Sequence, residues 1–157
     1  MEWGLAIGLF AAAIAAILPG MGSAKAVGLA GETAAGVSAE TPEASSKLTL
    51  LQLLPATQGI YGFVIAIVIM AKIGIMGGSG AVVSVDKALM LLAAALPIAL
   101  VGYFSAIAQG KCAAGSMLMV GRRPEMQGKG MMMTAMVETY AVLALLISFL
   151  CVNAIVL

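Results

Sequence analysis

Four apolar stretches, each long enough to cross a lipid bilayer, fill most of this sequence. They cover residues 3–29, 48–73, 88–120 and 130–157. A helix needs about 20 consecutive apolar residues to cross the ~30 Å hydrocarbon layer of a membrane. With a mean hydropathy of +1.12 and only 10% charged residues, the chain has no room for a soluble domain beside them. The sequence therefore predicts an all-α membrane protein with four transmembrane helices.

The two halves of the sequence repeat each other at an offset of 82 residues. Identical residues at that offset include Gly20 and Gly102, Ser23 and Ser105, Gly28 and Gly110, Pro42 and Pro124, Glu43 and Glu125, Lys47 and Lys129, and Thr57 and Thr139. We infer two tandem duplicated helical hairpins, residues 1–75 and 76–157. Because each half has two spans, both halves must run through the membrane in the same direction.

Three short polar segments connect the spans, and their charges predict the orientation. Arg122 and Arg123 lie between the third and fourth spans, and an excess of Lys and Arg marks the cytoplasmic side. We therefore expect the connections near 32–47 and 116–129 to be cytoplasmic linkers and both termini to lie outside. Lys72 and Lys87, near the central connection, oppose this assignment. The net charge is +1, and the charged residues lie at the ends of segments instead of in a basic patch, so the sequence does not suggest nucleic-acid binding.

Small residues recur every four positions on the first and third spans, so each of these helices has a flat face. Lipid provides no hydrophobic force between helices, and rows of small residues let backbones approach closely. One interpretation is ordinary pairing within a chain. Two equivalent rows favour a tight ring of many copies, in which the packing positions would be Gly20, Ala24, Gly28, Gly102, Ala106 and Gly110.

Glu138 lies inside the fourth span, with no Lys or Arg near it in the sequence. An ionised carboxylate at the centre of a bilayer costs at least about 2.5–3.5 kcal/mol on insertion scales, so such a residue is functional by default. Gln58 and Gln109 also lie inside spans. At about 1.5 Å per residue, all three fall roughly 14–20 Å from the presumed cytoplasmic boundary. Residues at one depth can form one site.

Pro55 precedes Gln58 and should distort its helix, because proline lacks an N–H and clashes with the preceding turn. We expect a free backbone oxygen nearby, with the carbonyl of Leu54 as the candidate. This oxygen, the Thr57 hydroxyl, the side-chain oxygens of Gln58 and Gln109, and the Glu138 carboxylate would form the all-oxygen cluster that a hard cation prefers.

A single carboxylate predicts a monovalent cation. Na+ bound to the Glu138 carboxylate forms a pair with no net charge, and such a pair can face lipid. Tyr61, one turn after Thr57, is positioned to hydrogen-bond Glu138 and close the site. In the first half, the position equivalent to Glu138 is Ala56. The first hairpin has therefore lost its carboxylate, and each chain should carry one ion.

Three segments carry a resemblance to a known family. They are LLPATQGIYGF at 53–63, IAQGK at 107–111 and MVETY at 136–140. They resemble the K subunit, a c-type proteolipid of about 16 kDa, of bacterial V-type sodium-transporting ATPases. The likeness spans almost the whole chain. One departure is Ala56, where the family often has glycine, and this small change should leave the site intact.

The resemblance implies a four-helix protomer of a rotor ring in a bacterial plasma membrane, turned by ATP hydrolysis in a separate soluble head. The chain would not be an enzyme by itself. By that likeness, Na+ sits among the residues matching Leu54, Thr57, Gln58, Gln109 and Glu138, with the match to Tyr61 closing the site. Li+ is a possible substitute, and H+ is the alternative cargo. The implied partners are identical subunits, central-stalk subunits, membrane lipid and a stator subunit of the a/I type, whose arginine discharges the site.

Two other functions fit a small polytopic protein less well. A secondary transporter using Glu138 for protons and substrate would usually have inverted repeats, whereas this repeat is parallel. A purely structural four-helix protein would leave Glu138, Gln58 and Gln109 unexplained.

Overall fold

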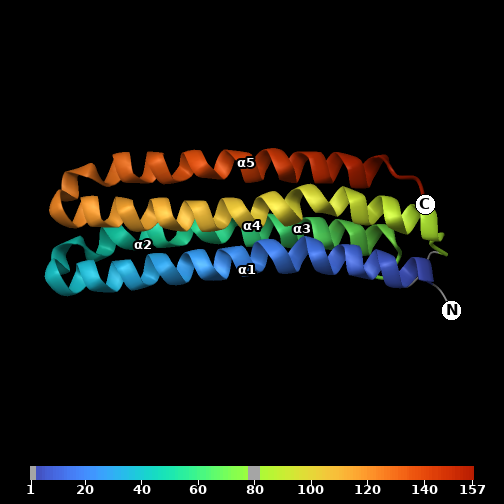
Figure 1. Ribbon diagram of the computed structural model, residues 1–157, viewed down its shortest axis with the longest axis horizontal. Helices are drawn as coiled ribbons and strands as arrows, with labels where there is room; N and C mark the ends of the chain where they lie inside the picture. The colour runs from blue at the N-terminus through green and yellow to red at the C-terminus, as the bar shows by residue number, and fades with distance from the viewer. Residues whose placement is uncertain (1–2, 78–81) are drawn as a thin grey trace.

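The computed structural model describes residues 3–77 and 82–157, and the regular structure in these segments is entirely helical. The elements are α1 (Trp3–Glu40), η1 (Pro42–Ala44), α2 (Ser45–Leu53), η2 (Leu54–Ala56), α3 (Thr57–Lys72), α4 (Val85–Arg122), η3 (Pro124–Met126) and α5 (Gln127–Ala154). The segment from η1 to α3 forms one continuous rod, so the molecule has four rods (Figure 1). All four are long and apolar enough to cross a membrane. The predicted four-helix fold is confirmed.

Proline ends the first helix of each hairpin at equivalent positions. Thr41, before Pro42, has φ −135° and ψ 78°, and Arg123, before Pro124, has φ −139° and ψ 86°. A residue that precedes proline is driven out of the α region by contact with the proline ring. A short 3-10 turn follows in both hairpins and starts the second rod. The duplication seen in the sequence is thus repeated in the backbone.

The predicted cytoplasmic linkers are mostly helical, which corrects their expected extent. α1 continues to Glu40 and α4 to Arg122, so the connections shrink to a few residues around Pro42 and Pro124. Residues 32–40 contain no proline and a single glycine, and loss of hydropathy alone does not end a helix. At about 1.5 Å per residue, each 38-residue helix is roughly 57 Å long and extends well beyond the hydrocarbon layer.

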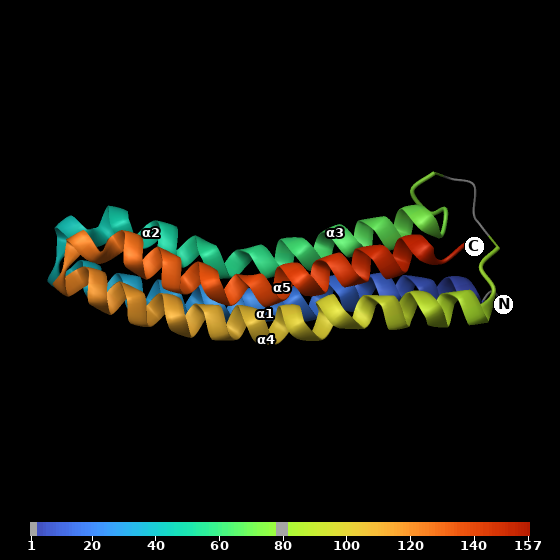
Figure 2. The same cartoon turned by 90° about the horizontal axis from the view of Figure 1, so that it is seen from above.

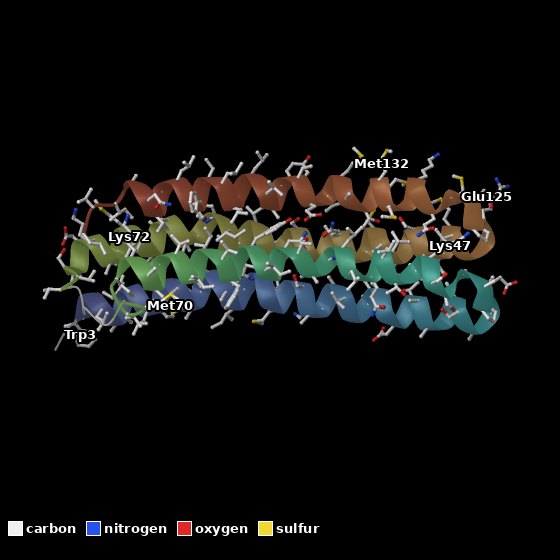
Figure 3. The ribbon with its side chains drawn as sticks, turned by 180° about the vertical axis from the view of Figure 1, so that it is seen from behind. Trp3, Lys47, Met70, Lys72, Glu125 and Met132 are labelled. Carbon is white, nitrogen blue, oxygen red and sulfur yellow. The ribbon has the colours of Figure 1, made fainter. Side chains whose placement is uncertain are left out.

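The four rods lie side by side, with both chain ends at one end of the molecule and the two proline turns at the other (Figures 1 and 2). α1 packs along α3, α4 packs along α5, and α1 and α4 make the most extensive contact of all. Figure 3 shows Lys47 and Glu125 at the proline-turn end, and Trp3 and Lys72 at the opposite end. The two hairpins are therefore joined mainly through their first helices.

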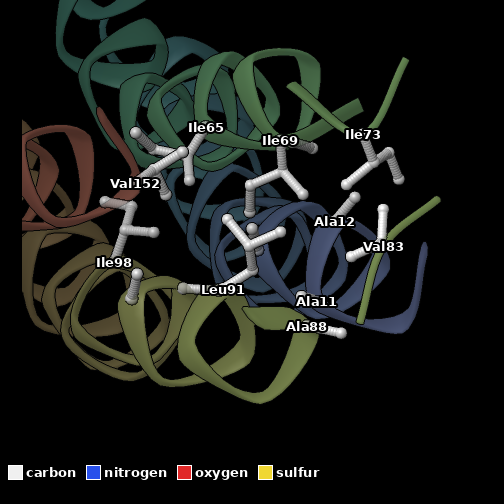
Figure 4. Close-up of a cluster of buried hydrophobic side chains, with 14 of the residues drawn as sticks. Ala11, Ala12, Ile65, Ile69, Ile73, Val83, Ala88, Leu91, Ile98 and Val152 are labelled. Atoms are coloured by element: carbon white, nitrogen blue, oxygen red, sulfur yellow. The ribbon is translucent and has the colours of Figure 1, made fainter. Parts of the chain in front are cut away.

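Two apolar clusters hold the rods together, one on each side of the middle of the molecule. The larger cluster, near the chain ends, includes Ile65, Ile69, Leu91, Ile98 and Val152 (Figure 4). The smaller cluster, toward the proline turns, is formed by Ala30, Val37, Leu48, Leu51, Ala113, Met117 and Val120. The polar residues of the predicted site lie between these two clusters.

The outer surface of α5 is strongly apolar. Met132, Met136, Leu143 and Leu150 are each at least 60% exposed. α5 is the least buried of the four candidate spans, and α4 is the most buried. Such a continuous apolar face is stable in lipid and not in water, which agrees with a multi-pass membrane protein.

Candidate ion-binding site

Pro55 distorts the second rod where the sequence predicts. The rod changes from α2 to the 3-10 turn η2 over Leu54–Ala56 and then resumes as α3. The equivalent residues of the second hairpin, 136–138, have Val137 in place of proline and continue as regular α5. The proline is therefore what differentiates the two hairpins at this level.

The carbonyl oxygen of Leu54 is not free, contrary to the simplest expectation. It accepts hydrogen bonds from the backbone N–H of Thr57 and from the Thr57 hydroxyl, the latter at 2.9 Å. The tight 3-10 turn brings both donors of Thr57 onto this oxygen. An ion held by both residues would have to displace the hydroxyl hydrogen from the carbonyl while keeping the two oxygens close together.

Gln58 and Gln109 meet in the interior, and both side chains are fully buried. Nε2 of Gln58 donates to Oε1 of Gln109 at 2.6 Å, and Nε2 of Gln109 donates to the carbonyl of Thr134 at 3.1 Å. Gln109 of α4 therefore connects α3 to α5. Oε1 of Gln58 has no hydrogen-bond partner among the described residues. A buried acceptor left unsatisfied costs about 1–3 kcal/mol, and a cation would satisfy it.

Glu138 is half-buried and accepts a hydrogen bond at Oε1 from the hydroxyl of Tyr61. A shallow groove of about 400 Å³ reaches the carboxylate from outside the bundle, lined otherwise by Ala135, Thr139, Val142 and Leu143. None of the side-chain hydrogen bonds of the described residues joins Glu138 to a Lys or Arg. The acid thus has a neutral partner within the chain and a route to the lipid-facing surface.

Four contacts beside the site were not predicted from the sequence. The carbonyl of Thr134, a fully buried residue, accepts from Gln109, and its hydroxyl donates to the carbonyl of Gly130 at 2.9 Å. Ser105 donates to the carbonyl of Val137 at 3.1 Å, next to Glu138. The hydroxyl of Ser23 accepts from the N–H of Gly59 at 2.9 Å. The sequence signal for the contacts of Ser23 and Ser105 was that serine occupies both of these equivalent positions of the repeat.

The structure separates the two rows of small residues. On α4, Gly102, Ala106 and Gly110 are buried, and Gly102 and Gly110 face Pro19 and Ala26 of α1. They serve packing within the chain, one of the two interpretations of these rows. On α1, Ala24 and Gly28 are exposed, Gly20 is partly exposed, and a Cβ added at Gly20 or Gly28 would meet no atom within 4 Å. A role for either row in a ring stays a prediction.

The site thus gathers residues of three of the four rods into three direct pairs: Leu54 with Thr57, Gln58 with Gln109, and Tyr61 with Glu138. All of the grouped atoms that can accept are oxygens, and one group, Glu138, is a carboxylic acid. Oxygen-only donors with a single negative charge suit a small monovalent cation or a proton and do not suit a soft metal.

Comparison with known proteins reproduces the internal repeat. The family model that describes the C subunit of ATP synthase matches the chain twice, at residues 10–69 and 92–151. The second match begins and ends 82 residues after the first, which is the offset of the internal repeat.

Two relatives align along nearly the whole chain. V-type sodium ATPase subunit K of Enterococcus hirae is 47% identical over 149 residues, which are 95% of this chain and 92% of that protein. A-type ATP synthase subunit K of Methanocaldococcus jannaschii is 36% identical over 142 residues, 90% of this chain, and the chain spans about 61% of its length. The duplicated match and these identities show that the chain belongs to the family of ATP synthase C subunits.

Proposed function

We propose that this chain is the ion-carrying K subunit of a V-type ATPase, and that it translocates Na+ as part of a rotor ring turned by ATP hydrolysis in a separate soluble head. The observation that carries the proposal is the buried Oε1 of Gln58, which has no hydrogen-bond partner in the part of the chain that the structure describes and belongs to the same group of polar residues as Glu138. A proton carrier needs only the acid, whereas two buried amides beside it are explained by cation coordination.

In this proposal, Glu138 neutralises the ion, and Gln58, Gln109, Thr57 and the carbonyl of Leu54 supply neutral oxygens. The hydroxyl of Tyr61 holds the carboxylate in place through its hydrogen bond. Similarity to a relative named as a sodium ATPase subunit supports Na+ as the cargo. Li+, with the same charge and a preference for oxygen, is the expected substitute.

Release of the ion requires another positive charge, because an ionised Glu138 facing lipid is costly. The groove beside Ala135, Thr139 and Leu143 gives such a charge access to Glu138 from outside the bundle. We propose that an arginine of a stator subunit approaches there. We also propose that central-stalk subunits bind near the proline turns, on the cytoplasmic side, with both termini outside.

The experiment is carbodiimide labelling of Glu138 in the membrane-extracted assembly, with NaCl or choline chloride at equal ionic strength. Protection of Glu138 by NaCl near neutral pH, and not by choline, is the expected result. Labelling that depends on pH alone and is unaffected by Na+ would identify protons as the cargo and contradict the sodium proposal.

A further inference from the structure

Two serines at equivalent positions of the repeat, Ser23 of α1 and Ser105 of α4, contact different backbone groups of the neighbouring rods. Ser23 accepts a hydrogen bond from the N–H of Gly59 at 2.9 Å, and Ser105 donates one to the carbonyl of Val137 at 3.1 Å. The equivalent of Val137 in the first hairpin is Pro55. In a regular α-helix, the carbonyl of residue 55 would pair with the N–H of residue 59. The two serines therefore contact opposite ends of the same repeated backbone hydrogen bond.

In the second hairpin this backbone hydrogen bond does not depend on a side chain. α5 is a regular α-helix from Gln127 to Ala154, so the carbonyl of Val137 has an N–H partner four residues later. The hydroxyl of Ser105 adds a second donor to an oxygen that already has one. Its contribution is a link between α4 and α5.

In the first hairpin the same backbone hydrogen bond is interrupted by the turn at Pro55. α3 begins at Thr57, so Gly59 is the third residue of the helix and its N–H belongs to the first turn. The N–H groups of a first turn have no α-helical acceptor, and the side chain of the N-cap residue often supplies one. The N-cap residue of α3 is Ala56, which makes no such hydrogen bond. Ser23 supplies the acceptor from a different rod.

The turn that Ser23 caps carries two of the proposed ion ligands. Thr57 and Gln58 are the first two residues of α3, directly before Gly59. Ser23 is only 7% exposed, and a Cβ added at Gly59 would lie 3.3 Å from its Oγ, so α1 and α3 pack closely there. Without this hydroxyl, the N–H of Gly59 regains an acceptor only if the rod rewinds toward the α-helical bond with Pro55. Such rewinding would move Thr57 and Gln58.

We propose that Ser23 is a positioning residue of the ion site: its hydroxyl caps the first turn of α3 and thereby holds the oxygens of Thr57 and Gln58 where a cation can bind. The inference rests on the proposed function, because it requires that these two residues bind Na+. Ser23 is not a ligand and acts through Gly59. Ser105, its equivalent, joins two regular helices and has no turn to cap.

The first test measures Na+ protection of Glu138 from carbodiimide in Ser23→Ala. This change removes one oxygen atom, and native gels with circular dichroism check that the assembly and its helices are intact. We expect the half-protecting Na+ concentration to rise about five-fold or more, the equivalent of one lost hydrogen bond. The labelling rate in choline chloride should stay unchanged, because Tyr61 still donates to Glu138. Ser38→Ala, on the same helix, is the control, and Ser105→Ala should have a smaller effect than Ser23→Ala.

Three results would count against these proposals, and they differ from one another. Equal half-protection in Ser23→Ala and the unaltered protein would leave Ser23 with a structural role only and overturn the inference. Equal shifts in Ser23→Ala and Ser105→Ala would separate the effect from the turn at Pro55 and also overturn it. Absence of Na+ protection in the unaltered protein would contradict the proposed function itself, and this inference with it.

The second test perturbs the same contact from α3. In Gly59→Ala the new Cβ would lie 3.3 Å from Oγ of Ser23, so the hydroxyl has to move, whereas in a Ser23→Ala background that oxygen is absent. We expect Gly59→Ala to raise the half-protecting Na+ concentration, and to raise it by a smaller factor in the Ser23→Ala background, since both changes act through one contact. Equal factors in the two backgrounds would overturn the inference.

Discussion

The hydroxyl of Tyr61 on α3 donates a hydrogen bond to the Glu138 carboxylate on α5, linking residues 77 positions apart in the sequence. This contact joins the two hairpins at the only acidic residue in the middle of a described span. It fixes one carboxylate oxygen and leaves the other available. This hydrogen bond therefore sets the orientation of the Glu138 carboxylate relative to the oxygens around it.

Removal of this hydroxyl should weaken Na+ retention without removing the charge. A hydrogen bond to a charged group contributes about 1.5–3 kcal/mol, so Tyr61→Phe should raise the Na+ concentration that half-protects Glu138 from carbodiimide by about 10- to 150-fold. Tyr103→Phe is the control, because its hydroxyl contacts Lys25 instead of the site. Equal half-protection in Tyr61→Phe and the unaltered protein would show that the hydrogen bond has no part in ion retention.

The duplicated threonines allow a matched test of the Thr57 hydroxyl. Thr57 and Thr139 occupy equivalent positions, and each hydroxyl donates to a carbonyl three residues earlier at 2.9 Å. Only Thr57 lies among the proposed ligands. We expect Thr57→Val to weaken Na+ protection of Glu138 at least several-fold and Thr139→Val to leave it unchanged. Similar effects of the two variants would mean that the hydroxyl acts on the helix and not on the ion.

The Gln58–Gln109 pair should show strongly coupled effects. Gln109→Leu removes the hydrogen-bond acceptor of the Gln58 amide, and it also removes the side-chain donor to the carbonyl of Thr134, which keeps its backbone hydrogen bond within α5. A buried group left unsatisfied costs about 1–3 kcal/mol, so the loss of the partner of Gln58 should lower both Na+ affinity and the thermal stability of the extracted assembly. In a double-mutant cycle, Gln58→Leu with Gln109→Leu should lose less than the sum of the two single variants. Additive losses would indicate that the amides act independently.

Close approach of α1 and α4 predicts a stability effect at Gly110. A Cβ at Gly110 would lie 2.7 Å from the Cα of Ala26, whereas a Cβ at Gly128 would meet nothing within 4 Å. Overpacking typically costs about 1–3 kcal/mol. Gly110→Ala should therefore lower the melting temperature of the extracted protein, and Gly128→Ala should leave it unchanged. A Gly110→Ala variant as stable as the unaltered protein would contradict the packing described for this helix pair.

Much of the fold follows from the sequence because lipid imposes simple rules. Each span must satisfy its own backbone hydrogen bonds, so four apolar stretches become four helices. Pro42 and Pro124 end the first helix of each hairpin for local steric reasons. Hydropathy could not predict that α1 continues to Glu40, because it reports where lipid ends and not where a helix ends.

The members of the candidate site and the contact of Tyr61 with Glu138 were predicted from the sequence, whereas the other pairings were not. The bond from Gln109 to the backbone of Thr134 depends on how α4 and α5 are rotated against each other, which a single sequence does not reveal. The oxygen of Leu54 is taken by Thr57 because the backbone forms a local 3-10 turn there, and the kink expected from Pro55 did not specify that turn. The separate positions of the Gly102 and Gly20 rows, one buried within the chain and one at its surface, also depend on the packing of α1 against α4.

Equilibrium binding of radioactive Na+ to the purified assembly tests the sodium assignment most directly. We predict saturable binding of one Na+ per chain, displaced by Li+, and its loss in Glu138→Gln while the assembly stays intact on native gels. Absence of saturable Na+ binding in the unaltered protein, or undiminished binding in Glu138→Gln, would contradict the account.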